Sequence, residues 1–409
     1  MAAGARVVTL ATTLPAALMD DDQESRLASG DDATPRIGLI EQVDAFLALR
    51  DEWDALFARA ALPHQVFQSH VVLRHWAAHY LDAQTRLSIL TLRRDGRLVM
   101  VWPLVRQRRF GVETLRFMGI PIAQFGDVLV EKTGDEALLL GMGWHAFCSL
   151  RADIFEARKL RADSALASSG LLAGAACTEQ IEAPFADLVS RVGHDGPSQA
   201  YPARERSNHR RRLRRLAERG PLTFDLVVPG PDAAELAGEA VAMKQAALRR
   251  HGIIAPAISD PRFGAFFRDL AGDRAGGSPL RIAVISCAGQ PIGIDLSLDC
   301  KGTSFGHVIA SHPDHERGGV GGILIQHSFA GARGRGNTVF DLLGPADPYK
   351  LEHADGMTPV ADLTLPLSLK GRIVCGLGVQ RLRPALKTAI KRLPAPLTRP
   401  LAGWRALLS

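Results

Sequence analysis

Residues 303–343 read TSFGHVIASHPDHERGGVGGILIQHSFAGARGRGNTVFDLL. The pattern predicts a β-strand, the glycine-rich loop HERGGVGG, the helix ILIQHSFAGAR, and a second strand in TVFDLL. Gly318, Gly319, Gly321 and Gly322 let the backbone approach a ligand closely. The helix after them offers unpaired N–H groups and the positive end of its dipole, which favour a bound pyrophosphate. The stretch therefore predicts an anion-binding α/β domain, with a glycine cluster that serves only as a tight turn as the alternative.

The sequence on either side extends the same domain. Three alternating runs, RIAVISC, PIGIDLSL and TSFGHVIA, predict an antiparallel meander. Upstream, RERSNHRRRLRRLAERG predicts an arginine-rich helix that ends at Gly220, followed by the strand LTFDLVV and by helices around residues 233–250 and 260–271. Downstream, residues 359–367 predict one more strand. There is no GxxxxGK(S/T) motif, and no GxGxxG motif follows a strand, which argues against P-loop and Rossmann nucleotide sites.

The first part of the chain predicts a separate mixed α/β domain. Apolar residues recur at helical spacing over residues 41–60, and a second helix is expected over 71–80. The β-rich runs LSILTLRR and RLVMVWPLV are joined by Asp95-Gly96, which predicts a hairpin because this dipeptide tolerates the positive φ angles of a tight turn. A strand at 127–130, a helix around 136–150 and a strand near 178–181 complete this domain.

The 409-residue length is typical of two domains, which we place at residues 36–200 and 201–370. The boundary falls in the Gly-, Pro- and Ser-rich stretch 193–202. Residues 1–35 are expected to form a solvated tail, and residues 371–409 a basic tail. The composition, 46% apolar and 22% charged, is that of an ordinary globular protein, and no apolar run approaches the ~18 residues of a membrane-spanning helix.

The net charge of +6 is concentrated at the end of the chain. Residues 370–409 contain nine Lys and Arg and no acid, so the rest of the chain is slightly acidic. The arginine-rich run at 204–219 lacks interleaved aromatic residues, so it does not predict nucleic-acid binding. The basic tail has apolar residues at near-helical spacing, which leaves peripheral membrane contact open beside a solubilising role. Five cysteines without a CxxC pair, and only a faint imitation of a signal peptide at the start, favour the cytoplasm.

The chain resembles the GNAT acyltransferase superfamily, and more closely its CelD-like branch, which is related to the FemAB aminoacyltransferases. The motifs that carry this resemblance are RRRLRRLAERGPLTFDLV, GGVGGILIQHSF and FDLLGPADPYKLEHADG. In the last motif, Asp341, Gly344, Tyr349 and Lys350 match positions typical of the branch. The resemblance extends more loosely to DEWDALFARA, WPLVRQRR and FGDVLV, so that it covers about residues 37–367.

The resemblance implies an α/β protein (α+β, mixed sheets) with two tandem GNAT-like domains, the second of which binds an acyl-CoA, most simply acetyl-CoA. The acyl group would pass directly to an amine. The pyrophosphate of CoA would lie against the loop residues Arg317, Gly318, Gly319, Val320, Gly321 and Gly322. Tyr349 occupies the place of the tyrosine that commonly protonates the leaving thiolate in this superfamily. The sequence departs from the family pattern at Glu316, where Gln or Arg is usual, and at His353, where the branch often has Trp.

The residues also have to supply acid–base chemistry. A primary amine is mostly protonated at neutral pH, so its attack on a thioester requires a group that takes a proton. Asp295, His307 and Asp341 lie on predicted strands beside the expected cleft and are our candidates, and backbone N–H groups of 305–310 would hold the oxyanion. Lys350 is a candidate for binding a substrate phosphate or carboxylate. Each candidate also has a structural interpretation. Tyr349 would pack the loop on the sheet, and His307 would be a buried structural histidine. Asp341 would be a structural cap, and Lys350 would be solvated.

No metal site is predicted, because His307, His312, Asp314 and His315 lack the i, i+4 spacing of a zinc-binding helix. The sequence thus predicts a cytoplasmic, metal-independent, acyl-CoA-dependent N-acyltransferase. Two alternatives stay open. One is a FemAB-like enzyme that uses aminoacyl-tRNA, for which the arginine-rich helix would bind nucleic acid. The other is a non-catalytic accessory protein of polysaccharide or envelope assembly. Neither the acceptor amine nor the oligomeric state is encoded in a local motif.

Overall fold

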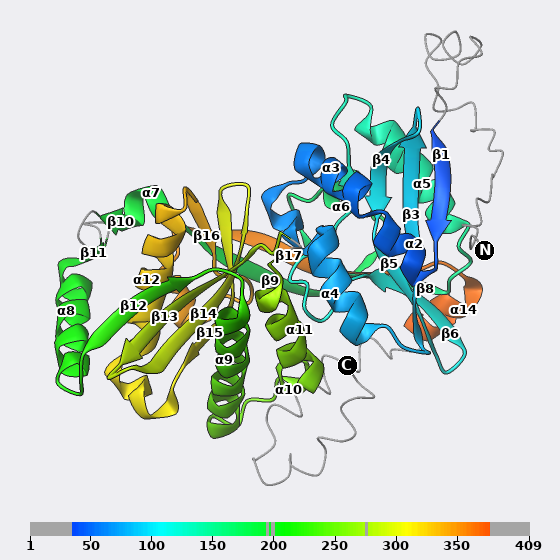
Figure 1. Ribbon diagram of the computed structural model, residues 1–409. Helices are drawn as coiled ribbons and strands as arrows, with labels where there is room; N and C mark the ends of the chain where they lie inside the picture. The colour runs from blue at the N-terminus through cyan, green and yellow to red at the C-terminus, as the bar shows by residue number, and fades with distance from the viewer. Residues whose placement is uncertain (1–34, 194–195, 198–200, 275–276, 377–409) are drawn as a thin grey trace.

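The computed structural model describes residues 35–193, 196–197, 201–274 and 277–376 (Figure 1). Nearly all of the predicted N-terminal tail and of the basic tail lies outside the described residues. The first half of the chain contains the strands β1 (Arg36–Ile40), β2 (Thr85–Leu87), β3 (Ile89–Arg94), β4 (Arg97–Trp102), β5 (Leu104–Arg109), β6 (Val112–Phe117), β7 (Leu129–Val130), β8 (Ile154–Arg161) and β9 (Ala176–Asp187). Its helices are α2 (Val43–Ala48), α3 (Arg50–Ala60), η2 (Pro63–Gln68, a 3-10 helix), α4 (His70–Tyr80), α5 (Glu136–Cys148) and α6 (Ala165–Ser168).

The second half begins with α7 (Leu188–Arg191), β10 (Val192–Gly193) and β11 (Gly196–Pro197). Its further helices are α8 (Ala203–Ala217), α9 (Pro231–Arg250), α10 (Pro256–Ser259), α11 (Pro261–Gly272), η3 (Pro313–Gly318, a 3-10 helix), α12 (Val320–Gly334), α13 (Pro348–Leu351) and α14 (Leu369–Gly376). Its further strands are β12 (Leu222–Val227), β13 (Leu280–Cys287), β14 (Gln290–Cys300), β15 (Thr303–Ser311), β16 (Val339–Asp341) and β17 (Gly356–Pro366).

Most of the strands form one continuous sheet. Its eleven strands run in the order β12-β13-β14-β15-β16-β9-β17-β8-β6-β5-β2, and a separate four-stranded sheet has the order β1-β3-β4-β7. The pairs β15–β16 and β6–β8 are parallel, whereas the other pairs of the large sheet are antiparallel. The predicted α/β class with mixed sheets is confirmed, and so is the meander β13-β14-β15.

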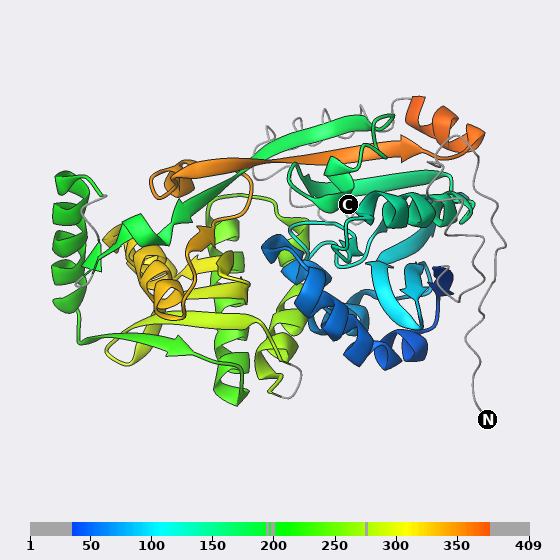
Figure 2. The same ribbon diagram turned by 90° about the horizontal axis from the view of Figure 1, so that it is seen from above.

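Two long strands connect the halves of the molecule. β9 pairs with β16 of the second half through Asp187↔Val339 and with β17 over most of its length. β17 in turn pairs with β8 of the first half, and Figure 2 shows β9 and β17 running side by side along the molecule. The sequence predicted a short strand near 178–181 and a strand at 359–367, each within one domain. The boundaries at 200 and 370 stay a prediction, because the two halves share these strands.

Local sequence signals explain several elements directly. Arg94 pairs with Arg97 across a turn in which Asp95 and Gly96 have φ angles of 52° and 73°, so the predicted hairpin is confirmed. The expected helix over 41–60 is instead two helices, α2 and α3, which meet at the buried Leu49. Helix α8 forms where the arginine-rich run predicted it and ends just before Gly220, whose φ is 152°.

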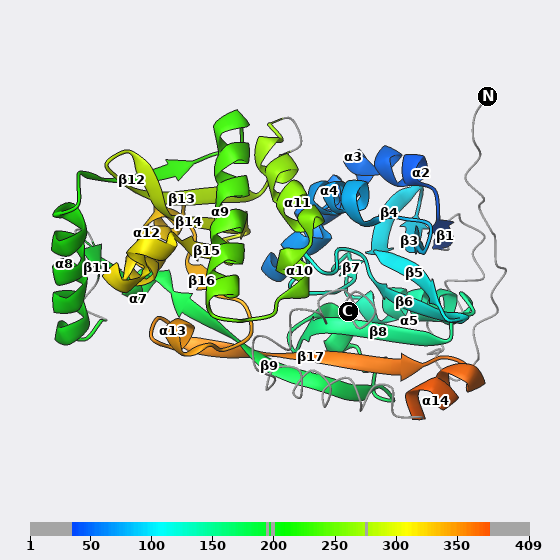
Figure 3. The ribbon, with the colours of Figure 1, turned by 90° about the horizontal axis from the view of Figure 1, so that it is seen from below.

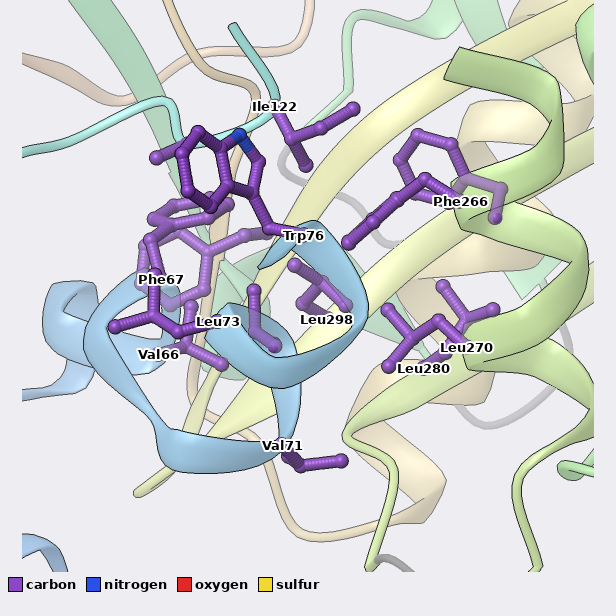
Figure 4. Close-up of a cluster of buried hydrophobic side chains, with 14 of the residues drawn as sticks. Val66, Phe67, Val71, Leu73, Trp76, Ile122, Phe266, Leu270, Leu280 and Leu298 are labelled. Carbon is purple, nitrogen blue, oxygen red and sulfur yellow. The ribbon is translucent and has the colours of Figure 1, made fainter. Parts of the chain in front are cut away.

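A buried apolar cluster fixes the two halves against each other (Figure 4). Side chains of the first half, among them Phe67 and Trp76, pack in the same cluster as Phe266, Leu270 and Leu298 of the second half. Fully burying a side chain of this size contributes roughly 1.5–3 kcal/mol. The halves therefore form a single packed unit, and groups from both of them contribute to the region beside β15 and β16.

Candidate active site

The strands β15 and β16 separate shortly after they meet. They pair in parallel only from Thr303↔Val339 to Phe305↔Asp341, although β15 continues to Ser311. The ladder between β14 and β15 shifts at the same level, so that His307 is an extra residue on β15. Such bulges often lie beside active sites because they redirect backbone groups. Beyond Phe305, the edge of β15 that faces β16 makes no ladder in the described part of the chain, so an extended ligand can pair with it.

The glycine-rich loop leads into helix α12 beside this opening. Gly319 is the N-cap residue with a φ of 74°, and no side chain caps the helix. The first N–H groups of a helix have no intrahelical partner and carry partial positive charge. The side chain of Val320 is fully buried, so this residue offers a ligand only its backbone. The side chain of Arg317 lies outside the described residues.

Helix α8 packs against this loop and adds a positive charge that the sequence analysis missed. A Cβ on Gly319 would lie 2.6 Å from Cδ of Arg212, and one on Gly322 would lie 3.2 Å from its Nη1. A Cβ on Gly318 would lie 3.0 Å from Cδ2 of Leu216, whereas at Gly321 it would meet nothing within 4 Å. A guanidinium at a helix N-terminus is electrostatically unfavourable unless an anion binds between the two. The glycines and Arg212 together therefore form a cradle that suits a phosphate.

Tyr349 lies on the short helix α13 after β16 and is 41% exposed. Partial burial of the side chain, together with the charges of Asp347 and Asp295, raises the pKa of Tyr349 to about 12. The phenol is thus protonated at neutral pH and able to donate a proton. This is the state that a group protonating a leaving thiolate requires.

Lys350 turns away from solvent and holds the loop that precedes Tyr349. Its Nζ donates to the carbonyl oxygens of Leu343 at 2.9 Å and Pro345 at 3.0 Å. Burial lowers the pKa of Lys350 to about 8 despite the nearby charge of Asp347. Because two loop carbonyls already bind this amine, the contacts favour the structural interpretation of Lys350, as a brace for Tyr349, over the predicted substrate contact.

Asp341 ends β16 and is almost completely buried. Its Oδ2 accepts from Nη1 of Arg161 at 2.7 Å, and its Oδ1 accepts from the backbone N–H of Leu343 at 2.8 Å. Burial raises the pKa of Asp341, while the charge of Arg161 opposes that effect. Both oxygens are bound, so the geometry makes Asp341 a structural tie between the two halves. Sequence analysis did not identify Arg161, because nothing in one strand indicates its partner in another.

His307 lies among the aromatic rings of Phe67, Phe263 and Phe267. Its Nε2 donates to the carbonyl oxygen of Ile122 at 2.7 Å, which assigns the proton to that nitrogen. Burial lowers the pKa of His307 to about 4, so the ring is neutral at pH 7. These contacts favour the structural interpretation of a histidine that joins the halves.

Asp295 lies on β14 with its carboxylate beneath helix α12. Ser297 donates a hydrogen bond to its Oδ2, and the hydroxyl of Ser328 on α12 lies close enough to lower the pKa of the carboxyl, although Oδ1 makes no well-formed hydrogen bond among the described residues. Burial raises the pKa of Asp295 to about 6. Among the described residues, Asp295 thus keeps one oxygen without a well-formed hydrogen bond, as His307 keeps its Nδ1, and the charge of Asp295 reaches Tyr349.

Lys244 of α9 is a further residue that the sequence analysis missed. Its Nζ donates to the carbonyl oxygen of Ile309 at 3.1 Å, on the part of β15 that has left β16. Burial lowers the pKa of Lys244. An amphipathic helix gives no sign of which lysine faces a site, so only the packing of α9 on β15 identifies it. No group of three or more His, Cys, Asp or Glu within the searched, described residues is placed to hold a metal ion.

Comparison with known proteins identifies the class. Residues 203–351 match the family described as "Acetyltransferase (GNAT) domain", and no curated protein matches the chain. The match begins at α8 and ends at α13, so it contains the cradle, the split strands and Tyr349. Residues 203–351 therefore form a GNAT domain, the fold of an acyltransferase.

Among solved structures, the chain is similar to FemX, with 12% identity, a TM-score of 0.54, and coverage of 78% of this chain and 96% of that one. It is also similar to the C-terminal domain of an Agrobacterium fabrum protein described as a lysylphosphatidylglycerol synthetase, with 13% identity, a TM-score of 0.51, and coverage of 81% and 95%. At such identities the likeness concerns the fold alone. It covers both halves of the chain, as the predicted pair of GNAT-like domains requires.

Proposed function

We propose that the protein is an acyl-CoA-dependent N-acyltransferase, most simply an N-acetyltransferase, that acts in the cytoplasm. The observation that carries the proposal is the opening between β15 and β16: the glycine cradle and Arg212 lie at the start of α12, which follows β15, and Tyr349 lies on α13, which follows β16. The cradle suits the pyrophosphate of CoA, and the free edge of β15 suits the amide-bearing pantetheine arm. The five cysteines are free, as expected in a reducing compartment.

The chemistry follows from the groups beside the opening. The acceptor amine attacks the thioester carbonyl, and backbone N–H groups next to the bulge at His307 stabilise the oxyanion. Asp295, through water, takes the proton that the amine loses. The carbon–sulfur bond then breaks, and the thiolate receives a proton from Tyr349. Lys350 and Asp341 act on this step indirectly. They hold the end of β16 and the loop after it, which together fix the position of Tyr349.

Calorimetric titration tests the proposal directly. We expect desulfo-CoA, which lacks the reactive sulfur, to bind the full-length protein, and acetyl-CoA to bind with similar affinity. Binding of tRNA without binding of CoA would instead support a FemAB-like enzyme that uses aminoacyl-tRNA. If neither ligand binds, the non-catalytic accessory role is left as the remaining interpretation.

A further inference from the structure

Helix α8 presents a row of arginines to solvent. Five of them are exposed, namely Arg204, Arg210, Arg211, Arg214 and Arg215. At 3.6 residues per turn, Arg204, Arg211 and Arg215 lie almost in line, and Arg210 and Arg214 lie together on one side of that line. Leu213 and Leu216 lie on the other side of the helix and pack in a cluster with α12. Within the described part of the chain, none of the five arginines takes part in an ion pair; Arg211 donates only to the amide oxygen of Asn208.

An apolar row lies on the strand that follows this helix. The side chains of Phe224, Leu226 and Val228 are 42%, 49% and 67% exposed; Phe224 and Leu226 alternate on β12 and share one face, and Val228 follows directly after the strand. That face is the one on which α12 packs, since Phe224 contacts His327 and Leu226 lies against Gly331. β12 is the edge strand of the large sheet and pairs only with β13 in the described structure. Large exposed apolar side chains in a row mark interaction surfaces.

The two features lie at the same end of the molecule, far from the first half. Figures 1 and 3 show α8 and β12 together at that end, joined by the turn at Gly220. Few acids offset the arginines: Glu205 accepts from Asn208, and Glu218 is exposed at the end of the helix. Asp225 alternates with the apolar row and so points to the opposite face of β12. We call the exposed arginines of α8 and the residues 224, 226 and 228 the α8–β12 surface.

We propose that the α8–β12 surface docks the protein onto an anionic lipid bilayer. Clustered basic side chains are attracted to the negative surface of a membrane, while adjacent apolar side chains bury themselves at the boundary between headgroups and acyl chains. A nucleic acid satisfies the arginines equally well, but its phosphate backbone offers nothing that buries Leu226 and Val228. The combination of unpaired arginines with an exposed aliphatic row therefore favours lipid over nucleic acid. This inference does not depend on the reaction that the site catalyses.

Flotation of the full-length protein with vesicles tests the proposal. We expect binding to phosphatidylcholine vesicles that contain about 30% phosphatidylserine, and little binding to phosphatidylcholine alone. The triple variant R211Q/R214Q/R215Q should bind the anionic vesicles at least about tenfold more weakly. The matched control R86Q/R108Q/R151Q removes the same charge from exposed arginines of the first half and should bind as the wild type does. A second variant, F224S/V228S, keeps every charge and should also weaken binding, because it removes the apolar contact.

Several outcomes would overturn the assignment. Wild-type protein that stays with the unbound fraction, or an α8 triple variant that floats as well as the wild type, excludes this surface as the membrane contact. Unchanged binding by F224S/V228S, together with arginine-dependent binding of tRNA, assigns the surface to nucleic acid instead. A wild-type dimer in light scattering that F224S/V228S dissociates assigns it to a second copy of the chain. Equal thermal melting of all variants ensures that these differences do not arise from unfolding.

Discussion

Arg161 Nη1 lies 2.7 Å from Oδ2 of Asp341, and this contact joins β8 of the first half to the end of β16 beside the opening. The side chains are only 11% and 4% exposed, so the pair lies in a region of low dielectric. Arg161 also contacts Asp163 and stacks on Phe125, with its guanidinium carbon 4.8 Å from the ring centroid. The position at which β16 leaves β15 is therefore fixed partly by a residue of the other half.

Replacement of Arg161 tests this relationship. Arg161→Met should lower the free energy of unfolding by about 3 kcal/mol, because it leaves the carboxylate of Asp341 buried without its cation. Asp163→Asn is the matched control: Asp163 is 56% exposed, so its loss should cost less than about 1 kcal/mol. Urea denaturation measures both. Equal stabilities of the two variants would contradict the structural role of the Arg161–Asp341 pair.

Tyr349→Phe should lower kcat by about 100-fold, because it removes a protonated acid from the leaving group. The affinity for desulfo-CoA should stay nearly unchanged, since the cradle at Gly319 does not involve the phenol. Steady-state kinetics and calorimetry separate these effects. Unchanged turnover would remove Tyr349 from the mechanism.

The two glycines Gly319 and Gly321 form a matched pair for testing the cradle. Gly319→Ala should weaken CoA binding and destabilise the protein by about 1–2 kcal/mol, because an L-residue at a φ of 74° is strained and its Cβ would collide with Arg212. Gly321→Ala should be tolerated, since the Cβ meets nothing within 4 Å and the N–H group remains. Calorimetry and thermal melting compare them. Equal loss of CoA affinity in both variants would indicate that the ligand itself approaches Gly321.

Asp295→Asn should abolish most turnover and yet stabilise the protein near pH 7.5. Its carboxyl pKa rises from about 3.9 when unfolded to about 6 when folded, so the native state binds the proton more tightly. Stability conferred by that proton is present at low pH and is lost as the pH rises from about 4 to 6. The variant should therefore be more stable than the wild type by about 2 kcal/mol at pH 7.5, with the difference shrinking near pH 4. Urea denaturation at both pH values checks the sign, and a constant difference would contradict the assigned pKa.

His307 should lower the stability of the protein as the pH falls, whereas Asp295 lowers it as the pH rises. Its pKa falls from about 6.5 when unfolded to about 4 when folded, so the unfolded state takes up a proton first. Stability is therefore lost as the pH falls from about 6.5 towards 4. His307→Phe should cost about 1 kcal/mol at pH 7, because Ile122 loses its hydrogen-bond donor, and should then lose less stability than the wild type on going to pH 5. A parallel loss in both proteins would show that His307 does not titrate on unfolding.

The sequence predicted the local pieces of the site well. Gly319, the helix that follows it, and Tyr349 were identified because a glycine cluster, a helical pattern and a short motif are properties of consecutive residues. The arginine-rich helix was also predicted, but as a solvated face. Whether Arg212 faces water or the loop at Gly319 depends on how α8 packs on α12, which no pattern within α8 records.

The amino-acid sequence by itself determined the elements: the hairpin at Asp95-Gly96, the meander, the glycine loop and the helices, because each depends on the φ angles and side-chain period of neighbouring residues. Only the tertiary structure decided which polar residues take part in the site. It bound both oxygens of Asp341, enclosed His307 in aromatic rings, turned Lys350 onto loop carbonyls, and left one oxygen of Asp295 without a well-formed hydrogen bond among the described residues. The physical reason is that the hydrogen bonds and the protonation of a buried polar group depend on partners distant in sequence. Here the strands that the two halves share bring those partners together.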